Sequence, residues 1–335
     1  MGTIRIAERL ARLGRVEWSA LSVPIVRGVL ILRGVLIVLI VPACWGLTAC
    51  HRAASTGRVY DSPEHAAEAL VSTVTRGTVD ELVAILGPDS RDLIDSADVA
   101  DARQSREVFA AAAKERWRLE DGASGAKTLI IGNEDWPFPI PIVHGSNGWL
   151  FDTAAGKDEV IARRVGRNEL EVIDVCRTYV AAQHLYAATG HDGQPAGAFA
   201  MAFRSDAGRQ NGLYWPVARR ERPSPLGDLV AQAAEEGRKF DPKAAPTPFH
   251  GYYFRILTAQ GAAAPGGAKD YVVSGRMTGG FALVAWPAVY DSTGVMTFIV
   301  GSDGVVHEKD LGPDSASAVS AMHDFNPDAS WSSVH

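Results

Sequence analysis

Hydrophobic spacing changes from helical to strand-like twice along this chain, and this repeated change limits the folds that it can adopt. Apolar side chains recur every three or four residues over 63–117 and again over 157–189. Each segment is followed by short apolar runs bounded by turn residues, over 127–152 and over 252–309. Helices that precede runs of strands, rather than alternating with them one by one, predict an α+β protein with antiparallel sheets.

The first change from helical to strand-like spacing predicts a unit of helices and short strands over residues 60–155. Ser62 and Pro63 are typical of a helix start, and Gly77 of a helix end. An Asn-Gly turn at 147–148 predicts a closing hairpin. The opening SPEHAAEALVSTVTRGTVDELVAIL and the closing GSNGWLFD resemble NTF2-like domains, in which a curved sheet wraps a long helix. This resemblance implies a cone whose mouth often holds a pocket, used for catalysis in some such domains and for binding or scaffolding in many.

The second change from helical to strand-like spacing predicts a long helix packed on an antiparallel sheet over residues 156–325, followed by a tail over 326–335. The segment GVMTFIVGSDGVVHEKDLGP, with its Ser-Asp-Gly turn, resembles the last strands in the head of a type IV pilin or pseudopilin. A pilin's own apolar helix and processing site are absent before Lys157. The resemblance therefore implies a fold and not an activity.

An apolar stretch near the N-terminus ends in the tetrapeptide LTAC at 47–50, which has the form of a lipobox, the cleavage site of bacterial lipoprotein precursors. Arg33 precedes the apolar stretch and small residues precede the cysteine, as in an exported precursor. Residues 1–49 are therefore predicted to be a lipoprotein-type signal peptide. Cys50 is the predicted lipid attachment site, and residues 50–59 the predicted tether.

The alternative for this region is a transmembrane anchor over residues 28–46. The unbroken apolar stretch after Arg33 is about 13 residues long, whereas a spanning helix needs about 20. A longer span would place Arg33 inside the bilayer, at a cost of about 2.5–3.5 kcal/mol. We therefore expect an exported protein on the periplasmic face of a membrane, held by the lipid on Cys50. The next residue is His51 rather than Asp, which favours the outer membrane.

The charge balance argues against one class of partner, and the cysteines against disulfides. The chain has 33 Lys and Arg against 39 Asp and Glu. Residues 1–49 hold six Arg and two Glu, so their removal changes the net charge from −6 to about −10. Such a surface repels nucleic acid. Cys176 would be the one remaining unmodified thiol, and its apolar helical context predicts a buried side chain rather than a nucleophile.

Motifs that name a reaction are missing from the sequence. It has no G-x-S-x-G, no H-E-x-x-H, no P-loop, no dinucleotide fingerprint and no paired C-x-x-C. We therefore expect no cofactor and no metal site, and the sequence favours a non-enzymatic protein. An envelope hydrolase or other enzyme is the alternative, with Asp152, Asn168 and Glu169 as the one polar group expected to line a cleft between the two units.

Aromatic residues beside prolines or glycine are the candidate binding residues, and they occur in both halves of the chain. Aromatic rings on rigid loops can stack on sugars or hold a peptide, and the alternative is that they fill the interface between the units. If the units pack side by side, the rings would line one shared groove. The candidate ligand or partner contacts are Trp136, Phe138, Tyr214, Trp215, His250 and Tyr252.

Several longer segments together resemble an uncharacterised family of exported bacterial proteins, described as a domain of unknown function. They include EDWPFPIPIV, GLYWP, PSPLGDLVAQAAEEG and HGYYFRILTAQGAAAPGGAKDYVVSGRMTGGFALVAWPAVY, within residues 60–325. The resemblance implies export and a two-part α+β fold, and no activity. We therefore expect a lipid-anchored binding or scaffold protein with an envelope protein or glycan as its partner. A pilus- or secretion-associated component is a further alternative.

Overall fold

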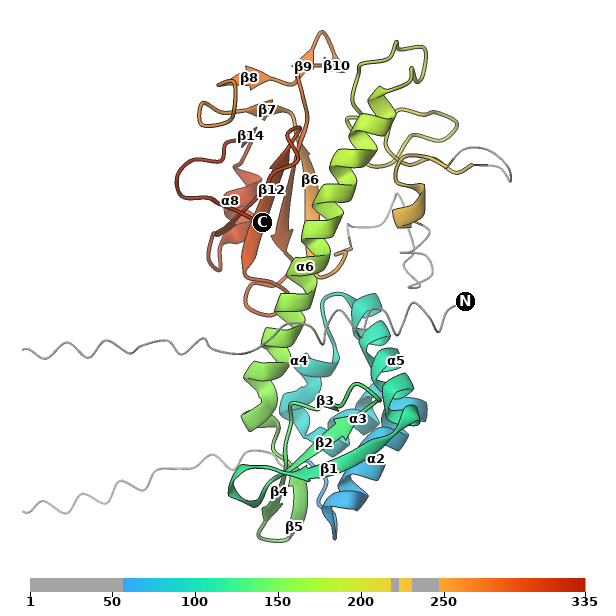
Figure 1. Cartoon of the computed structure of the whole chain (residues 1–335), viewed down its shortest axis with the longest axis vertical. Helices are drawn as coiled ribbons and strands as arrows, with labels where there is room; N and C mark the ends of the chain where they lie inside the picture. The colour runs from blue at the N-terminus through green and yellow to red at the C-terminus, as the bar shows by residue number, and fades with distance from the viewer. Residues whose placement is uncertain (1–56, 218–222, 231–246, 335) are drawn as a thin grey trace, which may run out of the picture.

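The computed structural model describes residues 57–217, 223–230 and 247–334, which form two lobes joined by one long helix (Figure 1). The N-terminal lobe comprises residues 57–152, and the C-terminal lobe residues 188–217, 223–230 and 247–334. Helix α6 (Thr153–Ala187) runs through both. Helices and antiparallel sheets make this an α+β protein, as predicted. The predicted signal peptide and Cys50 lie outside the described residues.

The first helix of the N-terminal lobe begins where the sequence predicts, and side chains cap three of the helices in this lobe. The Ser62 hydroxyl accepts the His65 N–H at the start of the first helix, and Thr78 forms a reciprocal capping box with Glu81 at the start of the second. Asp98 caps the longest one. The helical elements are α2 (Pro63–Arg76), α3 (Val79–Leu86), η1 (Pro88–Ser90), α4 (Arg91–Ile94), α5 (Val99–Glu115) and the short η2 (Ala123–Gly125).

An antiparallel sheet completes this lobe, in the order β1-β2-β4-β5, with β3 paired to β2. The chain enters the lobe along this sheet, because Tyr60 exchanges two backbone hydrogen bonds with Trp149. Leu70, Ile85 and Leu129 are among the fully buried side chains between helices and sheet. The strands are β1 (Trp117–Asp121), β2 (Lys127–Ile131), β3 (Trp136–Pro137), β4 (Ile142–Gly145) and β5 (Gly148–Phe151).

The C-terminal lobe is built on a five-stranded antiparallel sheet in the order β15-β13-β12-β11-β6. A short mixed sheet and a two-stranded ribbon extend it (Figure 1). The last strand lies within the segment predicted to be a tail. The elements are β6 (Tyr252–Leu257), β7 (Ala259–Gln260), β8 (Lys269–Asp270), β9 (Val272–Val273), β10 (Arg276–Met277), β11 (Ala282–Pro287), β12 (Met296–Gly301), β13 (Val306–Asp310), α8 (Ser315–Ser320), β14 (Asp324–Phe325) and β15 (Ser332–Ser333).

Both faces of this sheet are covered, which explains why β11 is apolar at every position from Ala282 to Ala285. On one face the Tyr179 hydroxyl of α6 donates to the Ala282 carbonyl. On the other, the Arg255 guanidinium donates to the carbonyls of Val319 and Met322, beside α8. Residues 282–285 are all fully buried, as expected for a strand inside a sheet with two covered faces.

Helix α6 is continuous over 35 residues, through Gly166. Its first turns pack on η1 and α4 of the N-terminal lobe, and its later turns on β11, β12 and β13. Gly156 allows the close approach to the first lobe, because a Cβ there would lie 2.6 Å from the Ile140 Cα atom. No helix among the described residues has the length and apolarity to cross a membrane.

Candidate functional site

The two lobes are held together beside α6 by polar contacts rather than by apolar packing alone. Asp98, which is 2% exposed, accepts the Gly251 N–H at 3.1 Å and so joins the start of α5 to the C-terminal lobe. Asn168 on α6 donates to the Thr293 carbonyl at 2.9 Å. Arg167 pairs with Asp101 at 2.8 Å. Buried hydrogen bonds of this kind fix one orientation of the lobes, because breaking them would leave polar groups unpaired.

The backbone at 250–251 is shaped for this junction. Both residues have positive φ, +50° at His250 and +72° at Gly251. A Cβ on Gly251 would lie 2.5 Å from Nδ2 of Asn168, so only glycine allows the contact between the lobes. His250 is 5% exposed and its ring lies 4.1 Å from that of Phe249. The predicted site residue His250 is thus inside the junction and not on an open surface.

Tyr252 and Glu169 hold the start of β12 against α6. Oε1 of Glu169 accepts the N–H groups of Val295 and Met296, each at 2.9 Å, and lies 3.4 Å from the Tyr252 hydroxyl. That hydroxyl donates to the Met296 carbonyl. Burial, and then the neighbouring carboxylate, raise the pKa of Tyr252 well above its usual value. Tyr252 is therefore a buried structural residue.

The sequence places Asp152 with Asn168 and Glu169 in one polar group, and the structure separates them. Asp152 caps α6 by accepting the Ala155 N–H at 3.1 Å. Glu169 lies 17 residues further along the same straight helix, a rise of about 25 Å. The predicted carboxylate pair is therefore not formed, because both residues belong to one rigid helix.

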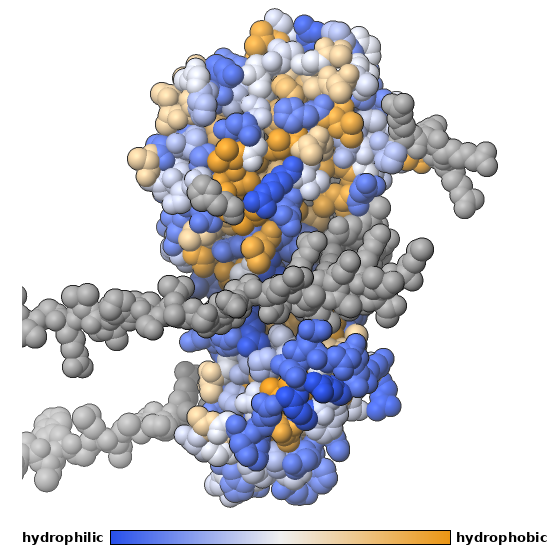
Figure 2. All heavy atoms as spheres, viewed as in Figure 1, coloured by the Kyte–Doolittle hydropathy of each residue, from blue (hydrophilic) through white to orange (hydrophobic). Residues whose placement is uncertain are grey.

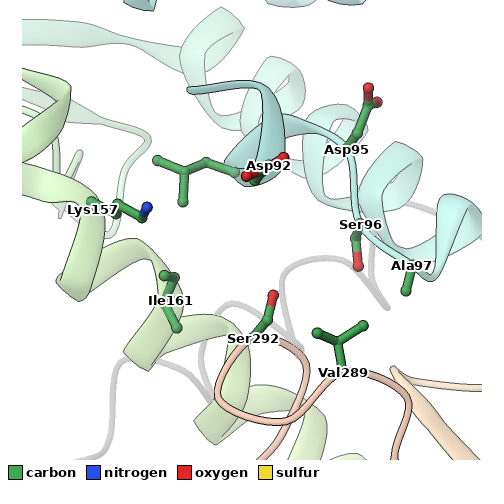
Figure 3. Close-up of a pocket in the computed structure, with 9 residues that line it drawn as sticks. Asp92, Asp95, Ser96, Ala97, Lys157, Ile161, Val289 and Ser292 are labelled. Atoms are coloured by element: carbon green, nitrogen blue, oxygen red, sulfur yellow. The ribbon is translucent and has the colours of Figure 1, made fainter. Parts of the chain in front are cut away.

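A hollow of about 380 Å³ opens between the lobes beside these contacts (Figure 3). Three segments that are far apart in the sequence form it: α4 with the loop that follows it, the first turns of α6, and the turn between β11 and β12. The lining residues are Asp92, Leu93, Asp95, Ser96, Ala97, Lys157, Ile161, Val289 and Ser292. The hollow is the candidate functional site because each wall comes from a different element of the fold.

Charged groups of both signs line this hollow. The Lys157 amine and the Ser292 hydroxyl point into the space in Figure 3, while the Asp95 carboxylate points away. Asp95 lies 3.6 Å from Arg91. Asp92 and Lys157 line the same hollow, yet among the described residues neither side chain makes a hydrogen bond or ion pair. The carboxylate of Asp92 and the ammonium group of Lys157 are therefore available to charged groups of a ligand.

A buried arginine supports the wall that carries Asp92. Arg164 of α6 is 8% exposed and donates to the backbone carbonyls of Asp92 and Leu93. Burial lowers the pKa of this guanidinium, and the positive charge of Arg167 lowers it further. Because Arg164 bonds to the carbonyls at the C-terminal end of α4, it fixes the backbone of this wall without neutralising the Asp92 carboxylate.

Trp136 and Phe138 pack within the N-terminal lobe. The Trp136 ring meets that of Phe109 edge-on, with centroids 6.5 Å apart, and the Arg163 guanidinium lies 5.0 Å above it. Phe138 contacts Phe109 and Phe151, at 5.5 and 6.2 Å. These rings therefore contribute to the packing of their own lobe.

Tyr214 and Trp215 lie near the other end of α6. The Trp215 ring lies 6.5 Å from that of Tyr186 and 5.3 Å from that of His191. The helix positions that contact Trp136 and Trp215, Arg163 and Tyr186, are separated by a rise of about 35 Å. The lobes are stacked end to end on α6 rather than side by side (Figure 1), so the predicted shared groove is not formed. Binding by either cluster alone stays a prediction.

Surface hydropathy also differs between the lobes. In the view of Figure 2, apolar side chains gather on the C-terminal lobe, whereas the N-terminal lobe presents a mainly hydrophilic face. Among the described residues, no group of three or more His, Cys, Asp or Glu side chains has the arrangement of a metal site. Cys176 is buried, and burial raises the pKa of its thiol to about 12, so it remains protonated.

Comparison with known proteins identifies the family of the chain. Neither a curated protein nor a solved structure matches it. The resemblances to NTF2-like domains and to pilin heads therefore have no support from solved structures. A family model does match, over residues 57–334, which covers both lobes and the helix between them. The chain belongs to the family described as protein of unknown function (DUF2950).

Proposed function

We propose that this protein is a lipid-anchored, non-enzymatic binding module of the bacterial cell envelope, and that it binds its ligand or partner in the hollow between the lobes. The observation that carries the proposal is the hollow itself, whose three walls converge only because both lobes are fixed to α6. Pockets at the junction of two structural units are common ligand sites. Two ionisable side chains that line the hollow, Asp92 and Lys157, are suited to bind charged groups of a ligand.

The remaining carboxylates of the junction have structural partners. Asp98 accepts backbone N–H groups from two different lobes, Asp101 pairs with Arg167, and Glu169 accepts two backbone N–H groups. General acid–base catalysis needs a titratable side chain, such as that of His, Asp, Glu or Lys, within reach of a bound substrate. These contacts support a role of the three carboxylates in holding the lobes together rather than in catalysis.

The proposed anchor would hold the N-terminal lobe close to the membrane. Arg58 already donates its backbone N–H to the Ala84 carbonyl, and a Cβ on Gly57 would lie 2.1 Å from the Ile85 carbonyl oxygen. Six residues lie between Cys50 and Gly57, so the seven steps of chain that join them can span at most about 25 Å. A lipid on Cys50 would therefore place this lobe nearer to the lipid surface than the other.

Site-specific photo-crosslinking in the bacterial envelope tests the binding site. A benzoylphenylalanine in place of Val289, which lines the hollow and is 46% exposed, should give an adduct of defined mass in the intact protein. The same probe at Val305, which is 41% exposed and outside the hollow, is the matched control and should give none. Equal adducts at both positions, or none at Val289, would contradict the proposed site.

Metabolic labelling tests the anchor separately. Labelled palmitate should be incorporated into the wild-type protein and not into the Cys50→Ala variant, which should accumulate as uncleaved precursor. Equal labelling of the two proteins would refute the lipid anchor and leave the binding site open to its own test.

A further inference from the structure

We infer that the hollow between the lobes binds a small zwitterion, an amino acid or short peptide with a free ammonium group and a free carboxylate. The inference rests on the proposed function and adds the chemical class of the ligand. It starts from two side chains, Asp92 on the N-terminal lobe and Lys157 on α6, which line one hollow with opposite charges.

Neither of these charged side chains has an ion-pair partner among the residues that the structure describes. Several exposed carboxylates of this protein pair with a nearby arginine, as Asp80 does with Arg91 at 2.5 Å and Glu159 with Arg163 at 2.7 Å. Asp92 and Lys157 line the same space without such a pair. Within the described part of the chain, neither has another ionic partner. A ligand with one charge of each sign could join both, with a charge-assisted hydrogen bond at each end.

A ligand with a single charge would fit less well. An anion bound by Lys157 would share the hollow with the carboxylate of Asp92, and a cation bound by Asp92 would share it with the ammonium of Lys157. Like charges placed close together in a protein–ligand contact are unfavourable, and they discriminate against the wrong ligand. Opposite charges on the two walls therefore select a ligand with both.

The size and the remaining lining restrict the ligand further. A volume of about 380 Å³ lies near the lower end of the range of about 300–1,000 Å³ for small-molecule sites. Between the charged walls lie the apolar side chains of Leu93, Ile161 and Val289 and the hydroxyl of Ser292. An amino acid or dipeptide with small or apolar side chains matches this lining, because its charged ends are separated by an apolar and amide-bearing middle.

Isothermal titration of the full chain in a non-ionic detergent tests the inference with four probes. Alanyl-alanine carries both charges, its N-acetyl form only the carboxylate, its amide only the ammonium, and the doubly capped form neither. We expect alanyl-alanine to bind with a Kd on the order of 0.1–1 mM, as its few atoms allow. Each cap should weaken binding about tenfold, through the loss of one charge-assisted contact.

Two variants assign each contact to a residue. Lys157→Gln should weaken the binding of alanyl-alanine about tenfold, because the carboxylate of the dipeptide no longer has a partner. Its affinity should then equal that of the dipeptide amide. Asp92→Asn should make alanyl-alanine equal to its N-acetyl form. Lys114→Gln and Asp89→Asn change exposed charges outside the hollow and should leave all four affinities unchanged. Unchanged melting temperatures show that the variants remain folded.

Three results would overturn the inference: no heat of binding with alanyl-alanine at about 10 mM, equal binding of all four probes, or a preference that neither hollow variant alters. The crosslinking at Val289 separates this failure from that of the proposed function. An adduct at Val289 without dipeptide binding would mean that the hollow takes a different class of ligand. The absence of both would reject the hollow as a binding site.

Discussion

Gly166 lies in α6 where the helix passes from one lobe to the other, and its replacement tests whether this segment is a rigid connection. A Cβ at Gly166 would have no heavy atom within 4 Å, so a methyl group fits without displacement. Glycine in a helix interior is about 0.5–1 kcal/mol less favourable than alanine. Gly166→Ala should therefore raise the free energy of unfolding by about that amount.

Thermal unfolding followed by circular dichroism measures the effect and also the size of the cooperative unit. If both lobes unfold together, as more than 250 residues, a gain of 1 kcal/mol should raise Tm by about 2 °C. If the N-terminal lobe unfolds alone, as about 100 residues, the same gain should raise its Tm by about 4–5 °C. Calorimetry separates the two cases by the number of transitions.

Gly156 in the same helix is the matched control. Its Cβ would lie 2.7 Å from the Pro139 carbonyl oxygen, so Gly156→Ala should destabilise the protein by about 1–3 kcal/mol. Opposite signs for the two glycines are the expected result. A Tm that is unchanged or lowered in Gly166→Ala would refute the reasoning, because it would mean that the helix needs the flexibility of glycine at this point.

Three further predictions concern packing and pH. Leu283→Ala, inside the central strand, should lower the free energy of unfolding by about 2–5 kcal/mol in urea denaturation, and an unchanged midpoint would place β11 outside the core. Trp136→Ala and Trp215→Ala should each lower Tm by the loss of half-buried rings, at about 1–3 kcal/mol; full stability in both would return these rings to the list of binding candidates. Burial, and then the charge of Glu169, raise the pKa of Glu308, so the stability that this group contributes below its ordinary value of 4.5 is lost as the pH rises through its folded pKa. Glu308→Gln should therefore stabilise the protein at pH 7 and lose this advantage below about pH 4.5, and an equal gain at both pH values would contradict the sign.

Local structure could be predicted from the sequence because its causes are local. Ser62, Thr78 and the glycines that follow the first two helices act on backbone groups within three or four residues. The strand Trp117–Asp121 was not predicted. Its Arg118 and Glu120 lie on a solvent-exposed face, where Arg118 pairs with Asp135, so the strand lacks an apolar signal. β1 is defined by its pairing with β2, which the sequence pattern of β1 alone does not indicate.

The candidate site could not be predicted, because no short segment contains it. Asp92, Lys157 and Ser292 are separated by 65 and 135 residues, and each lies in a stretch without a recognisable motif. The aromatic residues stand out in the sequence, but they did not indicate the position of the hollow. Trp136 and Trp215 were expected to share a groove, but the angle between two lobes depends on contacts such as Asn168 with Thr293, which the sequence pattern does not reveal.

Because α6 is continuous, the number of residues between two of its positions sets the geometry of the hollow, as well as the residue types that line it. One residue inserted between Lys157 and Asn168 would turn the C-terminal lobe by about 100° around the helix axis and move it by about 1.5 Å. The turn that carries Ser292 would then face a different side of α6. Seven inserted residues would nearly restore the direction but would separate the walls by about 10 Å. Members of the family that keep this hollow should therefore vary in loop length while the spacing from Lys157 to Asn168 stays constant.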